Sequence, residues 1–313
     1  MAVVVAQGVS LLSQTGVGIL GNSLLITLYL TSFLLGSKLK PIDLTIIHLA
    51  LVHTVMLLTR WIVMASGMLG LQLLQNDVEC KLFSYVYRIT QALSICTTSL
   101  LSVVQAITIS PITSYLYQIK VQIPKAIHPV LAILWIPNSL ISTNLLFQMF
   151  ASSNTTNLET NCYLVPINTL LQGLILTFMA LRDILALGLM SCCSGYVALL
   201  LHQHRNQVQH LHSPSQTPKT SPERRATQTI VLLVSCFVIF YCGDFVFSMF
   251  LGTSMKNNAA LSNAAMFVAS GYATISPFVL LTCDRSLIGF LDDFLGNRTL
   301  KSPQTTVLSA NPL

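Results

Sequence analysis

Charge is what this sequence has least of. Only 8% of its 313 residues are Asp, Glu, Lys or Arg, whereas 53% are hydrophobic. Soluble domains carry about 25% charged residues, so the composition excludes a soluble globular protein. Catalytic motifs are missing as well, since the chain has no nucleotide-binding glycine loop, no His-Glu-x-x-His and no nucleophile elbow. We therefore expect no enzymatic activity, no cofactor and no bound metal.

Three further absences narrow the function. The net charge of +6 is not gathered into a basic patch interleaved with aromatic residues, so we expect no nucleic-acid partner. A light-driven pump would need a lysine in its last helix for a retinal Schiff base, and none lies between Lys256 and Asp284. The chain lacks internal repeats and has few intramembrane acids, which weighs against a small seven-helix transporter, the alternative from a different class.

What the chain does contain is seven long uncharged stretches separated by short polar loops. A helix needs about 20 apolar residues to cross the hydrocarbon core. Barrel strands would alternate apolar and polar residues, which stretches such as 24–35 and 127–136 do not. The sequence thus predicts an all-α membrane protein, a bundle of seven transmembrane helices at residues 8–34, 44–65, 80–110, 127–150, 167–201, 225–251 and 261–283.

The basic residues predict how this bundle is oriented. Residues 1–13 carry no charge, so we expect the first helix to act as a signal anchor with its amino end outside. Seven crossings then place the carboxyl terminus in the cytoplasm. With this topology eleven basic residues lie inside and two, Lys81 and Lys256, lie in or beside outer loops. The inner ones are Lys38, Lys40, Lys120, Lys125, Arg205, Lys219, Arg224, Arg225, Arg285, Arg298 and Lys301.

Two inner segments have patterns of their own. Residues 202–223 are polar and contain three prolines, so we expect a mobile loop rather than a continuous helix. After the predicted bundle of residues 1–283, the tail of residues 284–313 begins with apolar residues at helical spacing. This spacing predicts a short amphipathic helix over about 285–296 along the inner membrane face, followed by disorder.

The eight cysteines divide by compartment. Only Cys80 and Cys162 fall on the outer side, which is oxidising, so we predict a disulfide from the third helix to the second outer loop. The other six are expected to behave as small hydrophobic residues. In the same outer loop Asn154 begins a glycosylation sequon. Asn297 begins another, which should stay unmodified because it lies inside.

Two groups of polar residues are candidate sites. His202, His204, His210 and His212 resemble metal ligands, but no acid or thiol lies nearby, and a solvated loop is the better interpretation. Ionisable groups within the membrane are usually functional. Arg60, Arg88 and Asp244 should lie at one outer level, which suggests a polar-lined cavity, while Arg182 and Asp183 lie near the middle of the fifth helix. The alternative is that the arginines reach toward the interface and Asp244 forms a structural pair.

The topology resembles that of a G protein-coupled receptor, and Gly21-Asn22 looks like the first-helix signature of that superfamily. Beyond this, the chain resembles the vomeronasal type 1 receptors, a family of pheromone receptors. The segments that carry the resemblance are Gln14-Thr15-Gly16, Gly21-Asn22-Ser23-Leu24, His48-Leu49-Ala50-Leu51-Val52, Leu181-Arg182-Asp183, Gln207-Val208-Gln209-His210, Ser221-Pro222-Glu223, Arg225-Ala226-Thr227-Gln228-Thr229-Ile230, Val234-Ser235-Cys236-Phe237, Phe240-Tyr241, Tyr272-Ala273-Thr274 and Ser276-Pro277-Phe278-Val279-Leu280.

Two departures from rhodopsin-like receptors agree with that family. The third helix ends in Thr108-Ile109-Ser110-Pro111 where those receptors have Asp-Arg-Tyr, and the seventh has Ser276-Pro277 in place of Asn-Pro. A bitter-taste receptor would share the architecture but not the run across helices five and six. Within the family, Cys192, Cys193 and Cys242 stand where bulkier residues, tryptophan among them, are expected.

The resemblance implies a plasma-membrane receptor for a small molecule that activates a heterotrimeric G protein. We expect a pocket in the outer third of the bundle, lined by Arg60, Arg88, Gln91 and Asp244. Cys96 and Phe245 are the candidates for its apolar wall. Two arginines against one acid favour an anionic ligand, with a neutral volatile as the alternative.

On the inner face, the resemblance implies that Arg224 and Arg225 contact the G protein. The competing interpretation is that these two arginines only enforce the topology.

Overall fold

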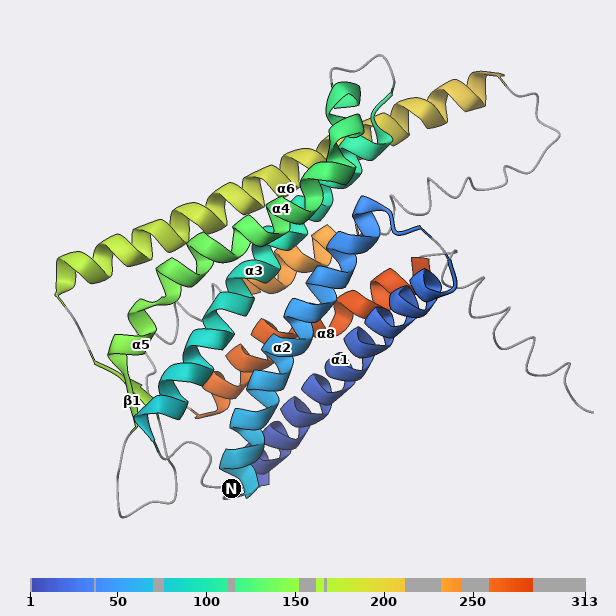
Figure 1. Cartoon of the computed structure of the whole chain (residues 1–313). Coiled ribbons are helices and arrows are strands. Elements are labelled where there is room, and N and C mark those ends of the chain that lie inside the picture. Colours follow the sequence, from blue (N-terminus) through green and yellow to red (C-terminus); the bar gives the residue numbers. More distant parts are fainter. Residues whose placement is uncertain are drawn as a thin grey trace, which may run out of the picture.

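The computed structural model describes residues 2–36, 38–69, 76–111, 116–151, 162–165, 168–211, 232–243 and 259–283, and nearly all of them are helical (Figure 1). Six of the described helices are long and apolar enough to cross a membrane, and a shorter apolar helix spans Leu232–Gly243. The predicted all-α membrane bundle is therefore confirmed. The elements are α1 (Ala2–Leu34), α2 (Pro41–Leu69), α3 (Asp77–Ile109), α4 (Leu116–Ser142), α5 (Asn144–Gln148), β1 (Met149–Ala151), β2 (Cys162–Leu164), α6 (Thr169–Leu211) and α8 (Ala259–Cys283).

Several predicted helix boundaries differ from the structure, and the two longest extensions arise because polar residues do not end a helix that leaves the membrane. Helix α4 begins at Leu116, eleven residues before the predicted start, and gives way after Ser142 to the short α5 and to β1. Helix α6 continues to Leu211, so the first half of the expected inner loop is helical. The three prolines of that loop come only after Leu211. In Figure 1 this end of α6 extends beyond the neighbouring helices.

Helix α3 is the centre of the bundle. In the most apolar 18-residue stretch of α3, 72% of the residues are buried, whereas the corresponding stretch of α6 is only 11% buried. Helix α6 therefore lies at the periphery. The buried face of α3 is rich in small hydroxyl residues, which let neighbouring helices approach closely. Their hydroxyls donate to carbonyls one turn back, as from Thr98 to Ser94 (2.8 Å) and from Ser102 to Thr98 (3.1 Å). Burial therefore leaves these hydroxyls satisfied.

The apolar core follows the same arrangement. One cluster is shared by α1, α2, α3, α6, the Leu232–Gly243 helix and α8, with fully buried members such as Leu25, Leu49 and Met190. A second cluster joins α3 to α4 through residues such as Val104 and Ile127. Helix α1 packs against α2 and α8.

The predicted disulfide is present and ties strand β2, which lies between α5 and α6 in the chain, to α3. Cys80, in the first turn of α3, is bonded to Cys162 of β2, with 5.7 Å between their Cα atoms. Strand β2 pairs antiparallel with β1, and Ala151 of β1 donates its N–H to the Asp77 carboxylate at 2.8 Å. The Lys81 ammonium lies 4.4 Å from the centre of the Phe150 ring. In Figure 1, β1 and the marked amino terminus lie at the same end of the bundle.

Several predicted features lie outside the described residues. These are Asn154, Arg224, Arg225, Asp244 and Phe245, together with the tail of residues 284–313 and its amphipathic helix. Of the four histidines, His202, His204 and His210 belong to α6, and His212 also lies outside. Among the described residues no His, Cys, Asp and Glu side chains form a group able to hold a metal.

Candidate functional site

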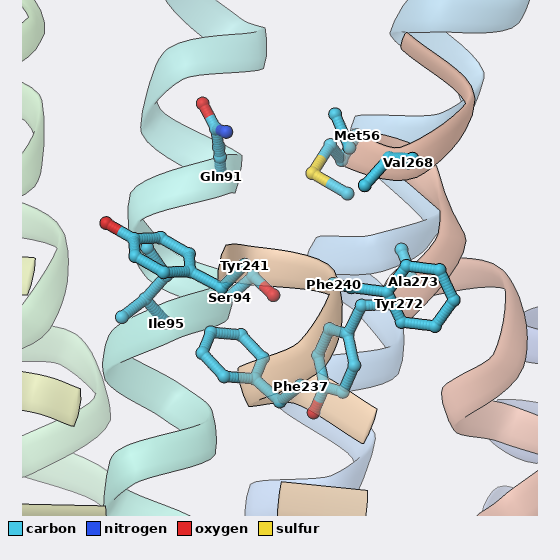
Figure 2. Close-up of a pocket in the computed structure, with 11 residues that line it drawn as sticks. Met56, Gln91, Ser94, Ile95, Phe237, Phe240, Tyr241, Val268, Tyr272 and Ala273 are labelled. Atoms are coloured by element: carbon cyan, nitrogen blue, oxygen red, sulfur yellow. The ribbon is translucent and has the colours of Figure 1, made fainter. Parts of the chain in front are cut away.

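A small cavity lies between α2, α3, the Leu232–Gly243 helix and α8 (Figure 2). Its volume of about 40 Å³ accommodates a few water molecules, far below the roughly 300 Å³ of a small ligand pocket. The side chains around it must therefore move to admit a ligand. The described residues that line it are Met56, Gln91, Ser94, Ile95, Phe237, Phe240, Tyr241, Val268, Ala269, Tyr272 and Ala273.

Aromatic rings form one wall of this cavity. In one helix, Phe240 follows Phe237 by three positions and Tyr241 follows it by four, so both lie on the same face as Phe237. The rings of Phe237 and Tyr241 are stacked, with centroids 5.9 Å apart and planes 15° from parallel. Tyr272 of α8 meets Phe237 edge to face at 4.6 Å. Such pairs stabilise packing beyond their buried area, so the rings support one another.

The two tyrosines turn their rings to the cavity and their hydroxyls away from it (Figure 2). Tyr241 donates to the Asp183 carboxylate at 2.9 Å, and the Tyr272 hydroxyl lies 3.1 Å from that of Thr98. Because these polar ends are bonded to protein groups, the rings present an apolar surface. The polar side chains left at the cavity are Gln91 and Ser94.

Ser94 belongs to a buried cluster centred on His53. The fully buried imidazole places Nε2 2.7 Å from the Ser94 hydroxyl and Nδ1 3.0 Å from the Ser276 hydroxyl. Its ring also meets Tyr272 edge to face at 5.3 Å. Both ring nitrogens are therefore occupied, and the cluster joins α2, α3 and α8 directly beside the cavity.

On the other side of Tyr241 lies an ion pair within the membrane-spanning part of α6. Arg182 and Asp183 are 2.7 Å apart, and Arg182 also donates to the Asn138 amide oxygen of α4 at 3.1 Å. The Asn138 nitrogen in turn lies 3.8 Å from the Cys96 sulfur. An intramembrane charge is expensive unless it is paired and hydrogen-bonded, and here both charges are satisfied. The network joins α3, α4, α6 and the Leu232–Gly243 helix.

Of the predicted ligand residues in the described chain, Gln91 lines the cavity. Arg60 does not, because its guanidinium donates to the Tyr87 hydroxyl at 2.6 Å and lies over that ring at 4.4 Å. This pair nevertheless lies one helical turn from the cavity, since Arg60 follows Met56 by four positions and Tyr87 precedes Gln91 by four. Arg88 is half-buried on α3 and is not among the residues that line the cavity.

Cys96 is not part of the cavity wall, contrary to the prediction. It follows Gln91 by five positions, which turns it about 140° around the helix axis, toward Asn138 of α4. The residues that share the Gln91 face are Ser94 and Ile95, three and four positions on.

The aromatic wall and the Asp183–Tyr241 bond were not predicted as site features. The available signals were the spacing of Phe237, Phe240 and Tyr241 and the two charges in the middle of a membrane helix.

Comparisons with known proteins agree on one family and one fold. Residues 5–293 match the model of the vomeronasal organ pheromone receptor family. The chain is 37% identical over 284 residues to vomeronasal type-1 receptor 100 of Rattus norvegicus, covering 89% of this chain and 86% of that receptor. It is 35% identical to vomeronasal type-1 receptor 45 of Mus musculus, with 89% of each chain covered. The crystal structure of squid rhodopsin superposes with a TM-score of 0.71 over 97% of this chain and 84% of that one, at 14% identity.

Proposed function

This chain belongs to the vomeronasal organ pheromone receptor family, and on that premise we propose that its cavity binds a small pheromone-like molecule and that binding activates a heterotrimeric G protein. The family consists of G protein-coupled chemosensory receptors rather than enzymes, and the protein is a multi-pass protein of the plasma membrane. The observation that carries the proposal is the position of the cavity, which side chains from four helices line together.

The lining supports a ligand with an apolar, ring-containing body and a polar group. Ligand pockets are mostly apolar with a few well-placed polar groups. Here the aromatic wall supplies the apolar surface, and Gln91 supplies a carboxamide that both donates and accepts. Arg60, one turn away, and Arg88 supply positive charge on the disulfide side of the cavity. An anionic group such as a sulfate or carboxylate would lie there. We also propose Asp244 and Phe245 as ligand residues from the sequence, although both lie outside the described residues.

Signal transfer would pass through the cavity walls. A ligand shifts a conformational equilibrium only by its difference in affinity for the two states. Ligand contact with Tyr241 acts on α6 through Asp183, and contact with Ser94 or Tyr272 acts on the His53 cluster. Both clusters join helices that are distant in sequence. Rearrangement of either one changes how the helices pack toward the inner face.

On the inner face we propose that Arg224 and Arg225, which precede the Leu232–Gly243 helix in the sequence, contact the G protein. In this topology the amino terminus is extracellular and the carboxyl terminus cytoplasmic. Exposed apolar residues of the peripheral α6, such as Leu174, Phe178 and Leu185, would face membrane lipid.

The ligand proposal is tested with matched compounds in cells that express the chain. A panel of cyclic alcohols and their sulfate esters is screened for calcium or cAMP responses. Arg60→Gln and Arg88→Gln should each weaken a sulfate agonist by about 1.5–3 kcal/mol, roughly 10- to 150-fold in potency, because a charged hydrogen bond is lost. Lys81→Gln removes a positive charge at the same end away from the cavity and should have little effect. If both arginine variants respond like the parent, these arginines are structural.

The coupling proposal has its own test. Replacing Arg224 and Arg225 together with glutamine should lower ligand-stimulated G protein activation at equal surface expression. Lys38→Gln with Lys40→Gln is the matched control, since it removes two inner charges from another loop. Equal activation in both double variants would contradict the contact and leave the arginines a role in topology only.

A further inference from the structure

We infer that Gly271 determines the width of the cavity, because the lack of a side chain at this position lets the Phe240 ring pack directly against the α8 backbone. Gly271 would thereby select ligands by the size of their apolar part. This inference rests on the proposed function of the cavity. Gly271 does not itself line the cavity, but it is buried and lies between Ala269 and Ala273, which do.

The evidence is the space that a side chain at position 271 would need. A methyl group on Gly271 would lie 2.6 Å from Cδ1 and 2.9 Å from Cζ of the Phe240 ring, and closer still to Cε1. Real Cβ atoms essentially never approach other atoms this closely. The aromatic ring thus occupies the volume of the missing side chain. In Figure 2 the Phe240 ring lies on the α8 side of the cavity.

A second glycine repeats the arrangement from the opposite helix. A methyl group on Gly243 would lie 2.9 Å from Cγ1 of Val268, another residue that lines the cavity. The Leu232–Gly243 helix and α8 therefore approach each other through reciprocal glycines, each facing a lining side chain. Helix pairs in membranes use small residues in this way to pack closely.

The direction of the effect follows from where Phe240 lies. Its ring is held between the α8 backbone at Gly271 and the cavity. A methyl group at position 271 pushes the ring off α8 and into the space that a ligand would occupy. The cavity of about 40 Å³ has little volume to lose. Bulky ligands should therefore be excluded more strongly than small ones.

The test measures cavity access without a known agonist. Ala269→Cys places a thiol on the lining, and membranes from cells expressing the full chain are treated with methyl or benzyl methanethiosulfonate. Both reagents are neutral and differ in bulk, and mass mapping of the peptide containing position 269 gives each rate separately from the native cysteines.

Adding Gly271→Ala should slow the benzyl reagent about tenfold or more, as overpacking of a full site predicts, and change the methyl rate less than about twofold. Phe240→Leu should restore the benzyl rate in the same chain. Gly188→Ala is the matched control, because a methyl group on Gly188 meets nothing within 4 Å.

The outcomes distinguish a failure of the proposed function from a failure of the inference about Gly271. If neither reagent reaches position 269 in the otherwise unchanged chain, the cavity is closed to ligands and the proposed function fails. If both reach it and Gly271→Ala leaves their ratio unchanged, or Phe240→Leu does not restore the benzyl rate, the inference about Gly271 is wrong. Should Gly271→Ala prevent folding, seen as loss of the Cys80–Cys162 bond, Phe240→Leu alone must raise the benzyl rate for the inference to stand.

Discussion

Tyr241 combines two roles in one side chain. Its ring lines the cavity, and its hydroxyl donates to Asp183, which forms an ion pair with Arg182. A hydrogen bond to a charged group contributes more than one between neutral groups. Tyr241 therefore connects the cavity directly to the ion pair of α6.

Removing only that hydroxyl tests the connection. Tyr241→Phe keeps the ring but breaks the bond to Asp183, and we expect a loss of about 1–2 kcal/mol in the free energy of unfolding. Tyr196→Phe on α6 is the control, because Tyr196 contacts the neutral hydroxyl of Ser110 at 3.1 Å. It should cost about 0.5–1 kcal/mol. Thermal unfolding of the purified receptor gives the order, and a larger loss for Tyr196→Phe would contradict the role of Asp183.

At the scale of the elements, close packing of α1 against α8 depends on glycine. Gly18 and Gly21 of α1 face α8, and Asn22 of the same helix donates to the Ala273 carbonyl at 2.9 Å. Ala273 is a cavity residue. The position of α1 therefore supports the backbone that forms the cavity.

A methyl group at Gly18 should separate these helices. It would lie 2.7 Å from Cδ1 of Leu57 and 3.1 Å from the Thr274 Cα, and the backbone atom cannot move aside cheaply. We expect Gly18→Ala to destabilise the receptor by about 1–3 kcal/mol. Gly16→Ala, two residues away, meets nothing within 4 Å and should be neutral or slightly stabilising, because alanine favours helix. Equal melting temperatures for the two variants would argue against tight packing at Gly18.

At the scale of the whole molecule, the described geometry and the charge distribution point to one topology. The amino terminus lies at the end of the bundle that carries β1, and β1 pairs with the strand that holds Cys162 (Figure 1). A disulfide forms on the oxidising side of the membrane. Most of the basic residues lie in the loops that our proposed topology places inside, as expected for an external amino terminus.

Glycosylation provides a direct test of that topology. We expect Asn154 to carry a glycan and Asn297 to carry none, because the proposed topology places only the first in the lumen during synthesis. Digestion with an N-glycosidase should shift the receptor on a gel, Asn154→Gln should abolish the shift, and Asn297→Gln should leave it unchanged. A shift that depends on Asn297 would reverse the orientation.

The candidate site was only partly predictable. Gln91 was predicted from its spacing to Arg88 on α3 and lines the cavity, whereas Cys96 was placed there and faces α4. Arg60 was identified as a notable charge, but its partner Tyr87 was not. Spacing along one helix shows which residues share a face, and it does not show which neighbour that face meets.

The sequence by itself determined that this is a membrane bundle, where most of its helices lie, which two cysteines pair and which family it resembles. The helix positions depend on local composition, since each apolar stretch responds to lipid on its own, and the cysteine pair follows from the side of the membrane on which each cysteine is expected. Only the tertiary structure decided which side chains surround the cavity. The contacts that form it join residues far apart in the chain, such as Thr98 with Tyr272, 174 positions away, and Ser276 with His53, 223 positions away. Such pairs are set by how helices pack against one another, which no single segment encodes.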